Sequence, residues 1–404
     1  MSNWKEVKLG SLCNLRRGAS PRPISDSKYF GDGAGWVRIS DVTSSKKYLK
    51  QTSQRLSSLG ESKSVRVVPG DVIMSICATI GKPVIVDMDA CIHDGFVVFK
   101  ELNPEVDNEF LTYWLNMKEG YFNSLGQHGT QKNLNTSIIN NTLIKLPPLK
   151  EQQKIAEILS SVDAAIEKTE QVIAKTEEVK KGLMQQLLTK GIGHTEFKES
   201  LFGLIPNDWM LVSLSEVADV RDGTHDSPKY QSSGIPFITS KNLRNGKIDF
   251  SDCNYITIED HKKFSVRSFV EKGDILFGMI GTIGSPVIVD IDIDFSIKNV
   301  ALIKLNKDIV DNRYMKYLLE SNLIQKEFSR VSDGGVQKFV ALSTIRKLKV
   351  PLPNLYEQQK IAKILLNQDS YLDSQFKKLS YLQEIKKGLM QQLLTGQVRV
   401  GALC

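Results

Sequence analysis

The decapeptide KKGLMQQLLT occupies residues 180–189 and returns, letter for letter, at residues 386–395. The hexapeptide EQQKIA also occurs twice, at residues 151–156 and 357–362, and both repeats are 206 residues apart (180 to 386, 151 to 357). A repeat of this length reports the architecture of the whole chain, because each copy implies the same supersecondary unit. The chain is therefore predicted to contain one fold twice.

Weaker similarities extend the repeat through the rest of each half. GDVIMSICATIGKPVIVD begins at Gly70, and GDILFGMIGTIGSPVIVD begins at Gly273. Trp4-x-x-Val7-x-Leu9 returns as Trp209-x-x-Val212-x-Leu214. The stretches between these anchors, such as 46–63 and 244–262, differ. The sequence thus predicts a common scaffold that carries two different surfaces.

The composition fits a folded, mildly basic protein. Its 404 residues, 41% of them hydrophobic, can bury a substantial core, and the length allows two to four domains. The formal charge of +7 has the sign that a polyphosphate partner favours, although an ordinary basic protein would carry it too. Five cysteines without a CxxC pair argue against a disulfide framework or a zinc site. No secretory signal pattern or membrane-length apolar run is visible, so we expect a cytoplasmic protein.

Each half is predicted to be a small α+β domain. Residues 72–86 and 275–289 are β-branched, apolar and interrupted by Gly-x-Pro, which is typical of two strands joined by a tight turn. Residues 36–39 and 236–239 resemble further short strands. Around residues 110–125 and 314–328 apolar residues return every three or four positions, which predicts one amphipathic helix per half.

A long helix is predicted to follow each half. LPPL at residues 146–149 and LPNL at 352–355 contain prolines that end one element and suit entry into a helix. In the first copy a seven-residue spacing is typical of a coiled coil, and the second copy is less regular but amphipathic. The spacing runs through Ile155, Val162, Thr169, Thr176 and Leu183, with companions three residues later at Ile158, Ala165, Val172 and Val179, and with Leu159, Ile166, Ile173 and Leu187 beside them. Residues 151–189 would span roughly 58 Å.

The two long helices are expected to pack on each other, because a helix of this length needs a partner to bury its apolar stripe. The first helix leads from the first half to the second, and the second helix leaves the second half. A second helix that lies alongside the first must therefore run back. This predicts an antiparallel pair, a pseudo-two-fold internal repeat, and a C-terminus near the first half.

This order of elements resembles the specificity (S) subunit of type I restriction-modification systems. The resemblance rests on the duplicated EQQKIA and GLMQQLLT segments and covers essentially the whole chain. It implies an α+β fold with two similar globular target-recognition domains separated by a pair of long antiparallel coiled-coil helices. The implied boundaries are residues 1–148 and 193–354 for the recognition domains, 149–192 for the first spacer helix, and 355–404 for the second spacer helix and tail.

The resemblance also implies a function. Each domain would read one half of a bipartite, asymmetric DNA site, and the helices would set the gap and dock two methyltransferase (M) subunits. Those subunits would carry S-adenosylmethionine and methylate adenine N6, and restriction/translocase (R) subunits would join for cleavage. The chain itself would be non-catalytic and hold no cofactor. In agreement, we find no NPPY-type methylation motif, no Gly-rich nucleotide loop and no His/Cys cluster with metal-ligand spacing.

Candidate DNA contacts lie at matching places in the two halves. Arg or Lys near glycine in a loop can approach phosphates or guanine, Asn suits adenine, and residues kept in both halves suit a shared phosphate contact. The candidates are Arg16, Arg17, Arg22, Arg38, Ser40, Gln131 and Lys132 in the first half, and Arg221, His225, Lys229, Ser240, Lys241, Asn242, Lys298, Gln337 and Lys338 in the second. Solvated loops, surface drift and structural turns explain the same residues, so both interpretations stay open.

On the long helices, the polar positions of the decapeptide are candidate contacts with the M subunits. They are Lys181, Gln185, Gln186, Lys387, Gln391 and Gln392. Burial between the helices competes with this role and is expected for the leucines. The charged runs Glu177-Glu178 and Lys180-Lys181 are expected to form solvated faces.

Two other functions are compatible with parts of the sequence. A single-chain nuclease or methyltransferase would need a catalytic cleft, but the acidic residues near Glu178 fall on the predicted spacer helix. A protein-interaction scaffold with two similar heads is the other alternative. Duplex DNA binding that weakens steeply with salt would favour the DNA reader over the scaffold.

Overall fold

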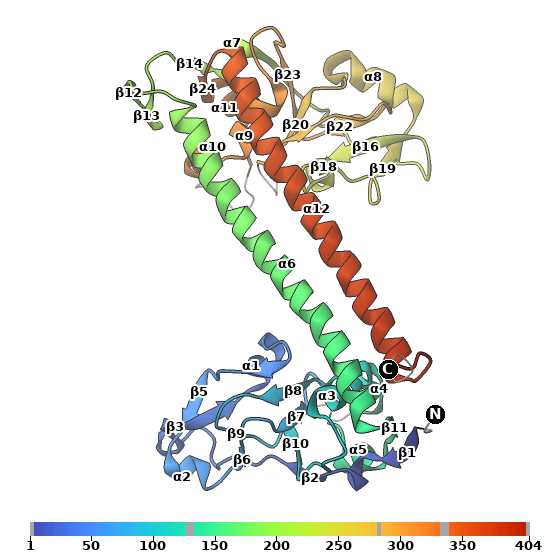
Figure 1. The fold of residues 1–404 in the computed structure, drawn as a ribbon. Helices are drawn as coiled ribbons and strands as arrows, with labels where there is room; N and C mark the ends of the chain where they lie inside the picture. The colour runs from blue at the N-terminus through green and yellow to red at the C-terminus, as the bar shows by residue number, and fades with distance from the viewer. Residues whose placement is uncertain (1–3, 127–132, 281–283, 332–338, 401–404) are drawn as a thin grey trace. The chain divides into compact units, whose positions relative to one another are not determined.

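The structure is a computed structural model that describes residues 4–126, 133–280, 284–331 and 339–400 (Figure 1). The chain divides into two compact units, residues 1–170 with 377–404 and residues 171–376. Each unit contains one globular domain, part of the long helix α6 (Leu149–Lys190) and part of the long helix α12 (Leu355–Leu394). The unit boundaries therefore cross both long helices.

Within the described residues, the first domain forms a five-stranded sheet of order β2-β10-β7-β8-β4 and a four-stranded sheet of order β5-β3-β9-β6. Strands β1 and β11 pair separately. Its strands are β1 (Lys5–Lys8), β2 (Asn14–Arg17), β3 (Phe30–Val37), β4 (Tyr48–Leu49), β5 (Gln54–Leu56), β6 (Val65–Val67), β7 (Val72–Ser75), β8 (Pro83–Val86), β9 (Ala90–Ile92), β10 (Phe96–Lys100) and β11 (Leu143–Leu146). Its short helices are α1 (Ile39–Ser44), α2 (Ser58–Glu61), α3 (Asn108–Met117), α4 (Glu119–Leu125) and α5 (Thr136–Asn141).

The second domain repeats this plan, with sheets of order β15-β23-β20-β21 and β19-β16-β22. Its strands are β12 (Phe197–Ser200), β13 (Gly203–Pro206), β14 (Met210–Ser213), β15 (Ala218–Asp222), β16 (Ile235–Thr239), β17 (Leu243–Arg244), β18 (Lys247–Ile248), β19 (Asn254–Ile256), β20 (Ile275–Gly278), β21 (Val287–Ile288), β22 (Ser296–Lys298), β23 (Val300–Leu305) and β24 (Lys349–Leu352). Its short helices are α7 (Leu214–Val217), α8 (Ile258–Ser268), α9 (Asn312–Glu320), α10 (Asn322–Val331) and α11 (Leu342–Lys347).

The sheet that contains β7 and β8 is buried on both faces, which explains its unbroken apolar sequence. Val72 and Met74 face one core together with Phe110 of α3 and Ile155 of α6. Ile73, between them, faces a second core with the other sheet. The second domain splits its core in the same way along β20 and β23. The predicted paired strands at 72–86 and 275–289 and the strands near 36 and 236 are confirmed.

The single amphipathic helix predicted in each half is wrong, because two helices occupy each place. In the first domain α3 gives way to α4 at Lys118, whose φ of −90° and ψ of 2° are not helical. In the second, Ser321 is extended, with ψ of 149°, and separates α9 from α10. Its hydroxyl donates to the carbonyl of Leu318 and helps to satisfy the end of α9. A spacing of three and four residues continues across both breaks, so it does not reveal them.

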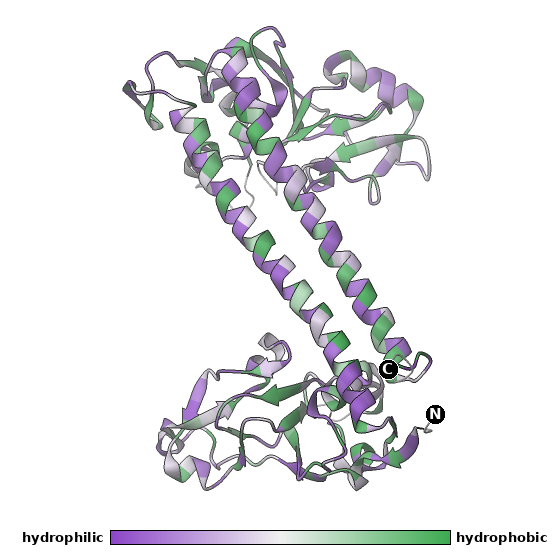
Figure 2. Cartoon of the chain, in the orientation of Figure 1, coloured by the Kyte–Doolittle hydropathy of each residue, from purple (hydrophilic) through white to green (hydrophobic). Residues whose placement is uncertain are grey.

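Helix α6 begins at Leu149, directly after Pro148, and α12 begins at Leu355, two residues after Pro353; hydrophobic residues recur along both helices (Figure 2). The buried stripe of α6 follows the seven-residue series from Ile155, as predicted, and the residues predicted beside it at Leu159, Ile173 and Leu187 are buried. The companions predicted three residues later point further outward, and Val179 is exposed. No helix in the described part of the chain is both long and apolar enough to span a membrane.

Two threonines lie in the buried stripe of α6 where apolar residues would be expected. Thr169 Oγ1 donates to the carbonyl of Ala165 and Thr176 Oγ1 to that of Val172, both at 2.7 Å. Each hydroxyl therefore finds its partner one turn back on its own helix and can be buried without a lost hydrogen bond.

The two long helices are antiparallel within each unit. In the first unit, Asp163 near the start of α6 pairs with Lys386 near the end of α12 at 2.7 Å. In the second, Lys180 near the end of α6 pairs with Asp369 near the start of α12 at 2.5 Å. Residues up to Val400 belong to the first unit, as predicted for the C-terminus. The expectation that Lys180 is solvated is wrong, because this ion pair holds it against α12.

Candidate nucleic-acid interface

A glycine follows the first strand of the main sheet in each domain, where the loop of candidate residues begins. The N–H groups of Gly18 and Gly223 each donate to a carbonyl at the start of the neighbouring strand, at 2.9 Å. A Cβ on Gly18 would lie 2.1 Å from the carbonyl oxygen of His93, and one on Gly223 would lie 2.3 Å from that of Ile297. Both positions therefore require glycine, and the two loops leave their sheets at equivalent places.

In the first domain, Asp94 holds this loop. Its carboxylate accepts a hydrogen bond from Ser20 Oγ at 2.6 Å and pairs with Arg22 Nη2 at 3.0 Å, while its carbonyl accepts from Arg17 Nε at 2.8 Å. Burial opposes the ionisation of Asp94, but Ser20 and Arg22 outweigh it and hold its pKa below the ordinary value. Arg16 and Arg17 at the end of β2 and Arg22 in the loop remain exposed, and Asp94 holds Arg22 through its carboxylate and Arg17 through its backbone carbonyl.

The loop after β3 lies close to the same place. Arg38 is half-buried and Ser40 is exposed, while the carboxylate of Asp41 accepts from the N–H of Arg38 at 2.8 Å. Burial and then the charge of Arg38 lower the pKa of His93, whose Nδ1 accepts from the N–H of Gly95 at 2.8 Å. His93 is therefore a packed, neutral ring, and Arg38 and Ser40 are the members of this loop that can reach a ligand.

In the second domain an imidazole takes the place of the arginines. His225 is 59% exposed on its side chain, with Nε2 2.9 Å from Asp222 Oδ2 and Nδ1 2.7 Å from Asn299 Oδ1. Asp222 is buried and also pairs with Arg267 Nη2. The sequence did not single out Arg267, which comes from α8. The side chains around the equivalent glycines Gly18 and Gly223 thus offer different hydrogen-bond donors and acceptors in the two domains.

The other loop candidates of the second domain differ in how firmly they are held. Lys298 Nζ donates to Ser227 Oγ at 2.6 Å and links β22 to the loop. The guanidinium of Arg221 is tied to Asp219 at 2.6 Å, whereas Lys229 is exposed. Lys229 is therefore the most available of these three cations.

The turn after β16 gives a structural role to two of its three candidates. Asn242 is almost completely buried, accepts from the N–H and hydroxyl of Thr239, and donates from Nδ2 to two backbone carbonyls. Ser240 is buried and donates to the carbonyl of Asn299 at 3.2 Å. Neither the Asn242 amide nor the Ser240 hydroxyl is free for a base. Lys241 is exposed, and its Nζ pairs with Asp252 Oδ2 at 3.2 Å.

Four further candidates, Gln131, Lys132, Gln337 and Lys338, lie outside the described residues. The residues that follow them return to equivalent strand ends. The N–H of Leu134 donates to the carbonyl of Ile76 at 2.8 Å, and the N–H of Val340 donates to that of Met279 at 2.9 Å. Leu134 and Val340 are therefore hydrogen-bonded to the residues that directly follow β7 and β20.

The six candidate partner contacts on the long helices are all exposed, while the leucines beside them are buried. In the second unit Lys181 and Gln185 line a recess of about 920 Å³ with the hairpin β12–β13 and with α10. Exposed Leu201 and Leu204 of that hairpin contribute to its wall. The polar positions of the decapeptide thus face outward, and in the first copy they line a recess with both polar and apolar walls.

Each domain is fastened to both long helices by a Tyr-Asp-Lys triad. Tyr113 OH donates to Asp163 Oδ2 at 2.6 Å, and the same carboxylate pairs with Lys386. In the second unit Tyr317 OH donates to Asp369 Oδ2 at 2.6 Å beside Lys180. Burial and the adjacent carboxylate raise the pKa of both tyrosines, so the hydroxyls remain donors.

The first glutamate of each EQQKIA segment accepts hydrogen bonds from a tryptophan and from a second side chain in both units. Glu151 accepts from Trp4 Nε1 at 3.2 Å and from Arg399 Nε at 2.7 Å. Glu357 accepts from Trp209 Nε1 at 3.0 Å and from His194 Nε2 at 2.8 Å. Arg399 and His194 thus fill equivalent places at the start of the two long helices.

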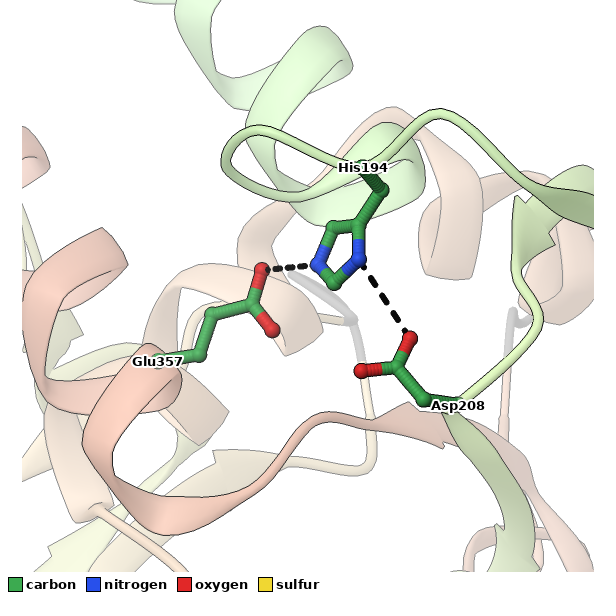
Figure 3. Close-up of side chains that lie close together, drawn as sticks. All are labelled: His194, Asp208 and Glu357. Atoms are coloured by element: carbon green, nitrogen blue, oxygen red, sulfur yellow. Dashed lines mark hydrogen bonds and ion pairs between the residues drawn. The ribbon is translucent and has the colours of Figure 1, made fainter.

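His194, Asp208 and Glu357 are also the described residues whose geometry could hold a metal ion (Figure 3). The two ring nitrogens of His194 face different carboxylates, with Nδ1 3.4 Å from Asp208 Oδ1. A metal would need one nitrogen and both carboxylates on the same side of the ring. Because the equivalent place in the first unit holds an arginine, the cluster fits an ion pair better than a metal centre.

Comparison with known proteins agrees with this repeated architecture. The family model of the type I restriction modification DNA specificity domain matches residues 1–178 and 206–387. The chain belongs to this family. The type I restriction enzyme MjaVIII specificity subunit of Methanocaldococcus jannaschii is 27% identical over 408 residues, which cover 98% of this chain and 93% of that protein. The putative MjaX specificity subunit of the same organism is 32% identical over 340 residues, or 76% of each chain.

Solved structures of specificity subunits share the fold. The S subunit from M. genitalium superposes with a TM-score of 0.58 and 17% identity, and the match covers 97% of this chain and 96% of that one. A chain from a study of complex assembly in a type I restriction-modification system gives a TM-score of 0.62 at 19% identity and covers 98% of both chains. Specificity subunits of this family are non-catalytic.

Sequence reasoning missed the groups that organise the recognition loops of this specificity subunit. Asp94 and Asp222 are not among the predicted contacts, because a carboxylate does not have the chemistry of a DNA contact. Asp222 follows the candidate Arg221 directly. An acid beside a predicted basic loop was the available signal. Arg267 carried no such signal, since it lies far from the loop in sequence.

Proposed function

We propose that each domain of this specificity subunit reads one half of a split DNA site through the loops that follow Gly18 and Gly223. The observation that supports this function is that both loops are fastened to the same backbone position but present different chemistry. Arg17 and Arg22 offer guanidinium donors beside Asp94 in the first domain. His225 and Lys298 offer different donors in the second. Two different half-sites require such a difference on a common scaffold.

The proposed contacts are the sequence candidates that remain exposed or half-exposed. In the first domain these are Arg16, Arg17, Arg22, Arg38 and Ser40, and in the second they are Arg221, His225, Lys229, Lys241 and Lys298. Gln131, Lys132, Gln337 and Lys338 stay in the proposal as phosphate contacts on sequence grounds. Ser240 and Asn242 are assigned to shaping the second loop.

We further propose that the exposed polar positions of the decapeptides dock two methyltransferase (M) subunits, which hold S-adenosylmethionine and methylate adenine N6. Restriction/translocase (R) subunits would complete a cleaving complex. The supporting observation is that Lys181, Gln185 and their counterparts 206 residues later face outward in both copies. A complex that acts on chromosomal DNA would work in the cytoplasm.

The test is methylation sequencing of DNA from a host that expresses this chain with its M subunit. A single bipartite motif is expected, and replacement of residues 1–148 by the first domain of another specificity subunit should change one half of that motif. Alteration of both halves would contradict independent reading. Binding of the complex to random duplex DNA should weaken steeply as salt rises, whereas a protein-interaction scaffold would show a flat or absent response.

A further inference from the structure

Helix α8 is an enlarged version of the four-residue helix α2 of the first domain. Each of the two helices follows the edge strand of a sheet, β5 in the first domain and β19 in the second. Strand β5 pairs antiparallel with β3, which pairs in parallel with β9; in the same way β19 pairs antiparallel with β16, which pairs in parallel with β22. Ser57 and Thr257 cap the two helices at the same point. Helix α8 spans 11 residues, so it adds about two turns at this edge of the second domain (Figure 1).

The added turns change the structure of a tripeptide that occurs in both domains. Ser64-Val65-Arg66 lies at strand β6, and Val65 is 4% exposed in the core. Ser265-Val266-Arg267 is helical, and Val266 is 86% exposed. A valine this exposed makes no contribution to the core, so folding of the domain does not account for its outward position.

The outward face of α8 combines this valine with positive charge. Phe264 and Ser268 are buried and fix the inner face, and His261 Nδ1 lies 2.9 Å from Ser296 Oγ. On the outer face, Lys262 and Lys263 are exposed and flank Val266 one turn away. Helix α8 also carries Arg267, Glu259 and the half-exposed Asp260, so its three cations outnumber its two anions.

Helix α8 is joined directly to the loop proposed to read DNA. Lys263 Nζ pairs with Asp226 Oδ2 at 3.2 Å, and Arg267 pairs with the buried Asp222. Arg221 Nη1 donates to the carbonyl of Arg267 at 3.3 Å. The helix and the loop that follows Gly223 therefore form one continuous surface within the second domain.

We propose that α8 lies in the major groove of the second half-site, with Lys262 and Lys263 against phosphates and Val266 against base edges. This inference rests on the proposed function and adds a reading element that the first domain lacks. The major groove admits an α-helix, and apolar side chains distinguish thymine there by its methyl group. The excess of positive charge on the outer face suits the phosphates on either side. A protein partner is the other occupant that such a face could have.

The test measures DNA binding by the chain assembled with its methyltransferase partner over a salt series. The double variant Lys262→Glu/Lys263→Glu is compared with the control Lys307→Glu. Lys307 is exposed and follows the end of β23, whereas the candidate Lys298 precedes the start of that strand. Each lost phosphate contact lowers the slope of log affinity against log salt by about 0.9, so the double variant should lose about 2. The control should keep the slope of the unmodified chain.

Equal behaviour of the double variant and the control would overturn the role of α8 while leaving the proposed function intact. Absence of salt-dependent DNA binding by the unmodified complex would instead overturn the proposed function and this inference together. Val266→Ser supplies an independent readout, because its exposed side chain can change without loss of folding. This variant should lower the preference for the correct base at one position of one half-site by about fivefold or more, measured by methylation. An unchanged motif would overturn the placement of α8 in the groove.

Discussion

Replacing Tyr317 by phenylalanine removes one oxygen from the triad that fastens the second domain to both long helices. The ring, its packing and its position over Lys180 at 5.8 Å are retained. The carboxylate of Asp369 loses the donor at 2.6 Å but keeps the ammonium of Lys180. The substitution therefore measures the hydroxyl alone.

The expected cost follows from the surroundings of the acceptor. A hydrogen bond to a charged group contributes about 1.5 to 3 kcal/mol to stability. The side chain of Asp369 is 27% exposed, so water can replace part of the lost donor, and the lower end of that range applies. For a unit of this size about 1.5 kcal/mol corresponds to a fall of roughly 3 to 6 °C in the melting temperature. Tyr113→Phe should act similarly on the first unit.

Calorimetric unfolding of the full chain measures this effect. Tyr381→Phe is the matched control, because Tyr381 lies on the same helix α12 and is exposed. The control should stay within about 0.5 kcal/mol of the unmodified chain. If Tyr317→Phe were as mild as the control, the triad would not fasten the domain, and the reasoning from its short distances would be refuted.

Three further predictions concern the first unit. Arg399→Gln should destabilise it by about 2 to 3 kcal/mol in urea unfolding, because Glu151 is 5% exposed and would lose its cationic partner; a change below about 0.5 kcal/mol would contradict this. Burial opposes the ionisation of Glu151, but Arg399 outweighs it and lowers its pKa, so the associated stability should be complete at neutral pH and disappear as the pH falls below about 4. Unfolding at pH 7 and pH 3 should show a smaller pH effect in Arg399→Gln than in the unmodified chain. Gly18→Ala should lower stability by about 1 to 3 kcal/mol and weaken DNA binding, because the new Cβ meets the carbonyl of His93, whereas Gly120→Ala, which meets nothing within 4 Å, should do neither.

The repeat and its spacing were enough to predict the fold. Identical segments 206 residues apart predicted two copies of one domain and two helices of matched length, and the structure has both. Periodicity located the buried stripe of α6 but did not separate its buried from its half-buried companions, because positions three and four residues ahead both flank the same stripe. The surface of α12 against which α6 packs decides which of the two positions is buried. Lys180, four residues after Thr176, lies at one of these positions and pairs with Asp369 of α12.

The candidate interface was only partly predictable, because residue type does not reveal direction. Asn242 has the chemistry of an adenine reader, yet its amide is consumed by the turn that it shapes. Asp222 carries the wrong charge for DNA, yet it holds His225 and Arg267 in place. The tripeptide Ser-Val-Arg lies at strand β6 in the first domain and in helix α8 in the second. Its conformation, and therefore the direction of its side chains, is determined by the surrounding chain and not by the tripeptide itself.

The pairing of Arg399 with Glu151 has a consequence for the order in which the protein is made. Residues 171–376 are contiguous, so the second unit can close as soon as its last helical segment leaves the ribosome. The first unit must wait for Arg399, which is 248 residues behind Glu151. At about 5 to 20 residues per second, this delay lasts roughly 12 to 50 s. The domain translated first is thus the last to be completed, and it is the one that chaperones have the longest time to bind.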